Sequence, residues 1–200
     1  MLFSDNSPTA IYETFRKLAS TCDQTADHSY RVCLLMKQVT RRLLLPVIEA
    51  EKYELAALLH DIGKIHVPFQ ILRKPTSLSP IERMQMQEHS ELGAKIASDM
   101  SCDLEIQLGL LHHHEWYNGE GYPFGLKGSE IPKIARMIAV LDAYDAITSD
   151  RPYRSKRSSE EACMELSKGK NTQFDPSAVE IFLNCLGQPA MSHLHTHGMV

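Results

Sequence analysis

The chain has 200 residues, of which 43% are hydrophobic and 23% charged, and its formal net charge at pH 7 is −4. This length fits one domain with a sizeable buried core, and the composition is typical of a soluble globular protein. Because basic residues are not in excess, we expect neither duplex nucleic acid nor a membrane among its partners.

Helical signals follow one another along almost the whole chain. Apolar residues recur at helical spacing, and capping residues followed by proline, or by glutamate three residues later, mark several helix starts. Ser79 and Ser158 begin such capping boxes, and Asp175 precedes Pro176 in the same way. In chain order, helices are predicted over residues 7–19, 26–44, 48–61, 79–96, 103–113 and 132–146, from residue 158 onward, and over 175–185.

The segments between these helices contain residues that favour loops. Residues 66–78 hold two prolines and little periodicity, and residues 118–123 are rich in glycine and proline. No stretch alternates long enough to predict a strand. The predicted fold class is all-α, with an N-terminal helix in residues 1–21, one helical bundle in residues 22–186 and a flexible tail in residues 187–200.

The cysteines and the first residues indicate a cellular compartment. The five cysteines are scattered without a pair at zinc-ligand spacing, and their odd number does not suggest a disulfide framework. No basic segment followed by an apolar core opens the chain, and the apolar run at residues 43–45 is too short to span a bilayer. We therefore expect buried thiols in a cytoplasmic protein without a membrane anchor.

The strongest chemical signal is the pair His60-Asp61 near the predicted end of a helix. Adjacent helical residues point about 100° apart, so both reach one site only if metal ions lie between them. A carboxylate can bridge two ions, whereas a neutral imidazole gives one nitrogen to one ion. A His-Asp pair alone is a weak motif, but further histidines and Asp142 accompany it here. Asp142 lies within an apolar helix, where a buried carboxylate is costly unless it is paired or bound to a metal.

The types of candidate ligand also limit which metals are expected. Imidazole and carboxylate groups without thiolates suit iron, manganese, zinc or nickel. Ligands that face a common core from several helices are the way in which helical bundles build di-metal sites. The sequence therefore predicts a metal centre inside the bundle.

A series of linked motifs resembles a known family. The motifs are HSYRV at 28–32, LLHDIGKI at 58–65, EH at 88–89, HHEWYNGEGYP at 113–123, IAVLDAYDAITSDRPYR at 138–154 and FDP at 174–176. In this order and spacing they resemble the HD-GYP family, a branch of the HD-domain metal phosphohydrolases, over residues 22–182. The resemblance implies an HD-type bundle with a Gly-Tyr-Pro loop, and hydrolysis of the second messenger cyclic di-GMP to pGpG, often on to GMP.

The same resemblance implies which residues bind metal. It assigns His28, His60, Asp61 and Asp142 to one ion, and Asp61, His89, His113 and His114 to a second. Asp61 would bridge the two ions, which are expected to be iron or manganese, and a bridging hydroxide would attack phosphorus in line. For each histidine the alternative is a hydrogen-bonded structural residue. His112 is expected beside the ligands or at the surface.

Other residues are implied as substrate contacts. Lys64 resembles the active-site lysine of the family, which reaches the phosphate and stabilises charge or donates a proton; its alternative is a solvated lysine. Arg151 and Arg154 have guanidinium groups that suit phosphate and guanine, and Tyr122 lies in the Gly-Tyr-Pro loop. Their alternatives are solvated arginines and a tyrosine that packs in the loop. Asp145 is expected to support a ligand or cap a helix.

Two departures from the family leave questions open. Three-metal members carry glutamate four residues before the first histidine, where this chain has Gln24, so two metals are expected. Members usually follow a sensory domain, which is absent from these 200 residues. The domain could work alone, be part of a longer protein, or respond to a partner such as a sensory protein or a diguanylate cyclase.

Two other functions compete with this interpretation. One is an HD phosphohydrolase that acts on another nucleotide, against which the Gly-Tyr-Pro loop and the segment RPYR at 151–154 argue. The other is a catalytically weak module that binds cyclic di-GMP and signals. Degenerate members usually lose metal ligands, and this sequence keeps them all.

Overall fold

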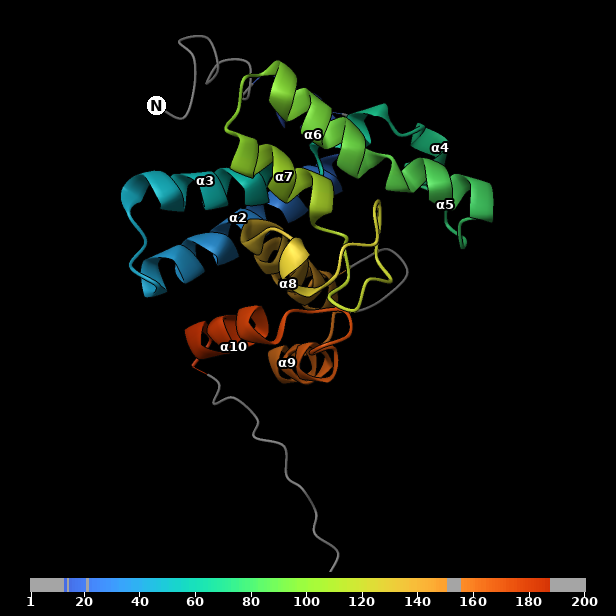
Figure 1. Cartoon of the computed structure of the whole chain (residues 1–200). Coiled ribbons are helices and arrows are strands. Elements are labelled where there is room, and N and C mark those ends of the chain that lie inside the picture. Colours follow the sequence, from blue (N-terminus) through green and yellow to red (C-terminus); the bar gives the residue numbers. More distant parts are fainter. Residues whose placement is uncertain (1–12, 14, 21, 151–155, 188–200) are drawn as a thin grey trace, which may run out of the picture.

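The computed structural model describes residues 13, 15–20, 22–150 and 156–187 (Figure 1). Over these ranges the chain forms helices and no strand, apart from an isolated bridge between Lys170 and Phe174, which confirms the predicted fold class. The elements are α2 (Asp23–Arg42), α3 (Val47–Leu59), η1 (Ile62–His66), α4 (Phe69–Leu72), α5 (Pro80–Gln87), α6 (His89–Asp99), α7 (Leu104–His112), η2 (Gly128–Glu130), α8 (Lys133–Thr148), α9 (Ser159–Lys168) and α10 (Pro176–Cys185).

The helix starts predicted from capping patterns are confirmed. The Ser79 side chain accepts a hydrogen bond from the Glu82 backbone N–H, and the Glu82 carboxylate accepts one from the Ser79 N–H. Ser158 and Glu161 form the same capping box at α9, and Asp175 caps α10. Residues 15–20 are helical, but the expected start of that helix at residue 7 and the tail after residue 187 lie outside the described residues.

Two helix predictions are wrong in detail. The loop predicted over residues 66–78 contains the short helix α4, whose first turn closes on the carbonyl oxygen of Pro68. The helix predicted over residues 79–96 is interrupted at Glu88, between α5 and α6. At this break, His89 donates its ring N–H to the Met86 carbonyl, and Ser90 donates its hydroxyl to the Gln87 carbonyl. These side chains take acceptors that the backbone ladder would otherwise use.

Helix α8 lies at the centre of the bundle (Figure 1). It contacts α2, α3, α7, α9 and α10. Large side chains from α2, α7, α8 and α10 fill the core and are fully buried: Met36, Ile106, Leu110, Ile138, Leu141 and Phe182. Because α8 is surrounded in this way, Asp142 and Asp145 on it lie among other helices, whereas Lys133 in its first turn is exposed. Among the described helices, none combines the length and apolarity needed to cross a bilayer.

A close backbone contact joins η1 to α6. At Gly63, a Cβ atom would lie 2.0 Å from the carbonyl oxygen of His89 and 2.6 Å from the backbone nitrogen of Gly93. Only a residue without a side chain allows this approach. The contact places Asp61, two residues before Gly63, beside the first turn of α6.

Candidate metal centre

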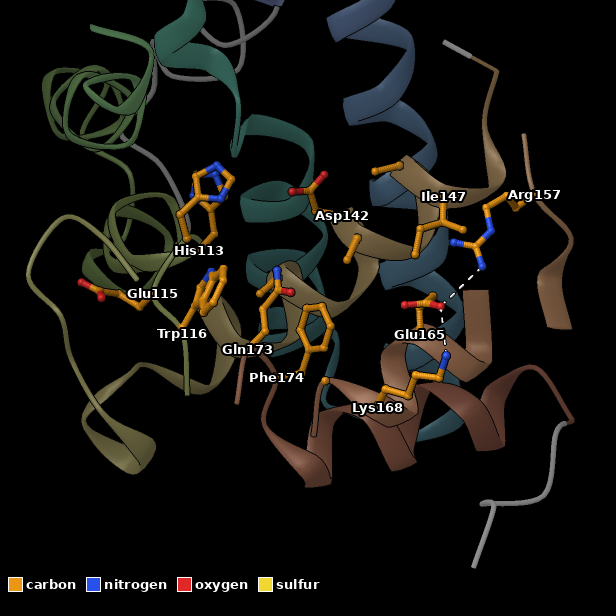
Figure 2. A pocket seen from close by; sticks show the side chains of 15 residues that line it. His113, Glu115, Trp116, Asp142, Ile147, Arg157, Glu165, Lys168, Gln173 and Phe174 are labelled. Atoms are coloured by element: carbon orange, nitrogen blue, oxygen red, sulfur yellow. Dashed lines mark hydrogen bonds and ion pairs between the residues drawn. The ribbon is translucent and has the colours of Figure 1, made fainter. Parts of the chain in front are cut away.

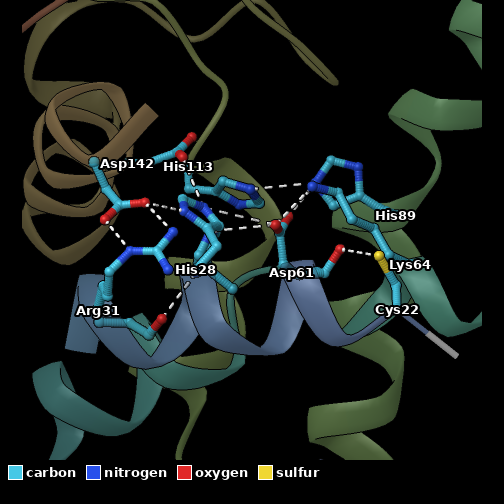
Figure 3. Close-up of polar contacts among 12 residues, drawn as sticks. Cys22, His28, Arg31, Asp61, Lys64, His89, His113 and Asp142 are labelled. Carbon is cyan, nitrogen blue, oxygen red and sulfur yellow. Dashed lines mark hydrogen bonds and ion pairs between the residues drawn. The ribbon is translucent and has the colours of Figure 1, made fainter. Parts of the chain in front are cut away.

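The seven predicted ligands come together in one site inside the bundle (Figure 3). They come from α2, the α3–η1 junction, the start of α6, the end of α7 and the middle of α8. His28, His60, Asp61, His89 and His113 are buried, and His114 and Asp142 are partly buried. Residues up to 114 positions apart in sequence therefore share one small volume, as the motif order predicted.

The donor atoms of these candidate ligands form two clusters. The donor atoms of His89, His113 and His114 lie within 4.8 Å of one another, and so do those of His28, His60 and Asp142. This grouping matches the two ligand sets implied by the family resemblance.

Asp61 lies between the two clusters. Its Oδ1 is 3.4 Å from His89 Nε2 in one cluster. Its Oδ2 is 3.6 Å from His60 Nε2 and 3.9 Å from His28 Nε2 in the other. The two oxygens of one carboxylate therefore face different clusters, which is the placement that a bridging ligand requires.

Three of the imidazoles are oriented by hydrogen bonds to nearby backbone carbonyls. His60, His89 and His113 each hydrogen-bond through Nδ1 to the carbonyl oxygen three residues earlier, at 2.8, 2.7 and 2.7 Å. Because a carbonyl only accepts, Nδ1 carries the proton and Nε2 keeps its lone pair. Such outer hydrogen bonds are typical of metal-binding histidines.

The Nε2 atoms of these histidines are placed to bind a metal ion rather than to hydrogen-bond one another. His89 Nε2 lies 3.3 Å from His113 Nε2 and 3.2 Å from His114 Nε2. His60 Nε2 is buried and has no hydrogen-bond partner among the described residues. The Nε2 atoms of His89 and His113 therefore direct lone pairs toward each other with no proton between them, which is unfavourable in a buried site. A bound cation would satisfy all of them.

His28 is held by a different arrangement. Its Nδ1 contacts Asp145 Oδ2 at 2.6 Å, and its Nε2 lies 3.0 Å from Asp142 Oδ1. Arg31 binds Asp145 with two hydrogen bonds, at 2.7 and 2.9 Å. Asp145 thus orients His28, in line with the supporting role expected for it. No role was predicted for Arg31, although it lies in the motif HSYRV, one turn after His28 on α2.

Burial sets the charge state of the histidines. It lowers the pKa of His89 to about 4 and, together with the neighbouring His89, that of His114 to about 3. Both rings are therefore neutral near pH 7, as ligands must be. Burial would also lower the pKa of His28, but its hydrogen bonds to Asp142 and Asp145 outweigh burial and raise that pKa to about 9.

The acidic groups stay ionised despite burial. Burial would raise the pKa of Asp61, but the nearby Lys64 and the surrounding histidines outweigh it, so this pKa is lowered. For Asp142, the hydrogen bond to His28 likewise outweighs burial and lowers the pKa. Two charged carboxylates are thus available beside the imidazoles of the site.

Lys64 lies at the edge of the site. Its Nζ is 2.6 Å from Asp61 Oδ2, and its side chain is 22% exposed. The ammonium group therefore lies next to the carboxylate at the centre of the two clusters while remaining open to solvent. This placement differs from that of a freely solvated lysine.

The Gly-Tyr-Pro loop packs against one cluster. The Tyr122 ring stacks on His114 with centroids 4.8 Å apart, and its backbone N–H donates to the His114 carbonyl. Burial raises the pKa of the Tyr122 hydroxyl, so this group keeps its proton. This position of Tyr122 is compatible both with the predicted contact to substrate and with the alternative role of packing in the loop.

A buried glutamate supports that loop. Glu115 is 2% exposed and accepts hydrogen bonds from the backbone N–H groups of Phe124 and Leu126, at 2.8 and 3.1 Å. Sequence reasoning missed this residue, although it directly follows the paired histidines. His112 is buried next to Glu115, with its Nδ1 3.7 Å from the Glu115 carboxylate, and lies outside both clusters as expected.

Arg151 and Arg154 lie outside the described residues. Gln24 lies one turn before His28 on α2 and is exposed.

A cavity of about 600 Å³ opens beside the clusters (Figure 2). His113, His114 and Asp142 line one end, and residues of α8, α9 and the segment 169–174 line the remainder. This volume lies within the range of roughly 300–1,000 Å³ that is usual for small-molecule sites.

The sequence profile described as "HD domain" matches residues 14–178 of the chain. The chain belongs to the HD domain family. Its resemblance to the HD-GYP branch, predicted from the motifs, is confirmed by the named relatives and by a similar solved structure.

Curated relatives cover most of this chain. A cyclic di-GMP phosphodiesterase of Pseudomonas aeruginosa is 40% identical over 181 residues, 90% of this chain and 43% of that protein. One of Thermotoga maritima is 38% identical over 163 residues, 80% and 44% of the two chains. A 3'3'-cGAMP-specific phosphodiesterase of Vibrio cholerae is 31% identical over 182 residues, 90% and 35% of the two chains. The chain thus spans less than half the length of each.

A solved structure shares the fold. An HDG"Y"P protein from Bdellovibrio bacteriovorus superposes with a TM-score of 0.65 at 22% identity, over 81% of this chain and 52% of that chain. The likeness agrees with the helical architecture of Figure 1.

Proposed function

We propose that the chain is a metal-dependent phosphodiesterase that hydrolyses cyclic di-GMP to pGpG. The observation that carries the proposal is the position of Asp61, whose two oxygens face two separate clusters of imidazole and carboxylate groups. Two-metal sites of this kind are used for in-line displacement at phosphorus. The relatives named as cyclic di-GMP phosphodiesterases support the choice of substrate.

The proposed ligands follow the two clusters. We assign His28, His60 and Asp142 to one ion, His89, His113 and His114 to the other, and Asp61 to both. Iron or manganese suits this thiolate-free donor set. When bound, the two ions would activate water and neutralise charge on the phosphoryl oxygens.

Other residues of the chain have supporting roles in the proposal. Lys64, with its ammonium group 2.6 Å from Asp61 and partly exposed, is placed to stabilise charge or give a proton to the leaving oxygen. Tyr122, which keeps its proton, can donate a hydrogen bond to a phosphate. Arg151 and Arg154 are proposed as phosphate contacts on the family resemblance alone.

A second substrate has a specific observation in its favour. The relative of Vibrio cholerae named as specific for 3'3'-cGAMP covers 90% of this chain. That dinucleotide has the same two-phosphate ring with one adenine in place of guanine, so the metal clusters would treat both alike. Regulation by a sensory protein or a diguanylate cyclase is proposed from the resemblance only.

The test combines metal analysis with turnover. Protein purified without oxygen would be analysed for iron and manganese and incubated with cyclic di-GMP, 3'3'-cGAMP and a mononucleotide, with pGpG and GMP followed by chromatography. We expect about two metals per chain and hydrolysis of cyclic di-GMP, and we expect Asp61→Asn to lose both. Metal-loaded protein that binds cyclic di-GMP without hydrolysing it would instead support a signalling module.

A further inference from the structure

The cavity beside the metal clusters has a second charged end (Figure 2). His113 and Asp142 lie at one end, and Arg157, Glu165 and Lys168 lie at the other. The two ends are parts of one cavity, so a single ligand of suitable length can reach both.

The backbone places Arg157 beside the last turn of α8. The Arg157 N–H donates a hydrogen bond to the carbonyl of Ile147 at 3.0 Å. Ile147 lies five residues after Asp142 on α8, which corresponds to a rise of about 7.5 Å along the helix axis. Between them the cavity is lined by Ala143 and Ala146, whose short side chains leave room above α8.

The cations at this far end are weakly held. Arg157 and Lys168 both contact the same oxygen of Glu165, each at 3.4 Å. Arg157 also lies 3.4 Å from Glu161, which does not line the cavity. The Arg157 side chain is 33% exposed and the Lys168 side chain 71%. Ion pairs with such exposure contribute little to stability. A second anion that enters the cavity and offers two oxygens can therefore compete with the Glu165 carboxylate for both cations.

A cyclic dinucleotide presents such an anion. Its ring holds two phosphodiester groups on opposite sides, and only one can be at the metal clusters during hydrolysis. The other keeps its negative charge and needs a cationic partner if it enters a partly closed cavity.

We infer that Arg157 and Lys168 bind the second phosphate of the cyclic dinucleotide, and that Glu165 holds both cations in place until substrate arrives. This inference rests on the proposed function and adds a substrate subsite to it. Arginine gives a phosphate two parallel N–H donors, and lysine adds a point charge.

The test uses two substrates that differ in the second phosphate. Bis(p-nitrophenyl) phosphate is a phosphodiester with a single phosphate, so it has no group for the subsite. For Arg157→Ala and for Lys168→Ala, we expect the ratio of kcat/KM for cyclic di-GMP to kcat/KM for this substrate to fall about tenfold or more. For Glu165→Gln we expect the ratio to rise, because the competing carboxylate charge is removed.

A matched control and a binding measurement complete the design. Lys95 pairs with Asp99 one turn away on α6, is 69% exposed and does not line the cavity, so Lys95→Ala should keep the wild-type ratio. Calorimetric Kd values for cyclic di-GMP in the same variants should shift in the same directions as the ratios.

The outcomes separate this inference from the proposed function. If Glu165→Gln lowers the ratio as much as Arg157→Ala does, the three residues are a structural ion-pair group and the subsite is excluded. An unchanged ratio and Kd in Arg157→Ala and Lys168→Ala also overturn it. If the wild type binds cyclic di-GMP without turnover, the proposed function fails, while the Kd series still decides the subsite.

Discussion

Replacing Gly63 by alanine should disturb the metal centre without touching a ligand. Gly63 is in contact with the backbone of α6, and Asp61 lies two residues before it. The position of Asp61 relative to His89 therefore depends on how closely η1 and α6 approach each other. Alanine adds one methyl group at the point of closest approach.

The size of the disturbance follows from the distances. The new Cβ would lie 2.0 Å from the His89 carbonyl oxygen, whereas folded proteins essentially never show such contacts below 3.0 Å, so the two segments must separate by at least 1 Å. Overpacking of this kind costs about 1–3 kcal/mol of stability. Metal–ligand distances tolerate only about 0.2 Å, so a shift of this size at Asp61 and His89 should weaken metal binding strongly.

The assay compares two glycines that face each other. A Cβ at Gly93 would meet no atom nearer than 3.5 Å, so Gly93→Ala should fold normally and gain about 0.5–1 kcal/mol from replacing a helical glycine. Metal content per chain and the thermal unfolding midpoint would be measured for both variants. If Gly63→Ala keeps the metal content and turnover of the wild type, the argument that this contact positions Asp61 is refuted.

Four other predictions test separate parts of the structure. Asp61→Ala should lose metal from both clusters together with hydrolysis, and elemental analysis showing two metals with near-normal turnover would remove the bridging assignment. Gln24→Glu should raise bound metal from about two towards three per chain, because it adds a carboxylate one turn before the first histidine, and three metals already in the wild type would exclude this explanation. Glu115→Gln leaves one loop N–H without an acceptor, so it should cost about 1–3 kcal/mol in thermal unfolding and raise the KM for cyclic di-GMP. The hydrogen bond from Lys74 lowers the pKa of Glu82 from 4.5 to about 2, so its stabilisation should be complete above pH 4.5 and lost as the pH falls through about 2; NMR titration of that carboxyl group with a midpoint near 4.5 would contradict this.

The grouping of the candidate ligands was predictable because it depends on residue type and order, while their binding of metal stays a prediction. Histidine and aspartate at these positions have few alternative uses, and their grouping in the structure follows the predicted sets. The supports were harder to predict because they depend on spatial contacts. Arg31 meets Asp145 across 114 positions, and Glu115 accepts from a loop whose path no local pattern specifies. The break at Glu88 arises from side-chain hydrogen bonds that helical periodicity does not show.

The hydrogen bonds from His60, His89 and His113 to carbonyls three residues earlier tie the distance between the two clusters to the packing of the helices. The His60 and His113 rings each take their direction from the last turn of α3 and α7. The His89 ring, at the start of α6, is held by a carbonyl at the end of α5, so it moves with the α5–α6 junction. The spacing between the two clusters is therefore governed by the distances between helix axes, which the volume of the core sets. Gly109, where an added Cβ would lie 3.2 Å from Ile134 on α8, is one position from which that spacing could be adjusted without altering any ligand.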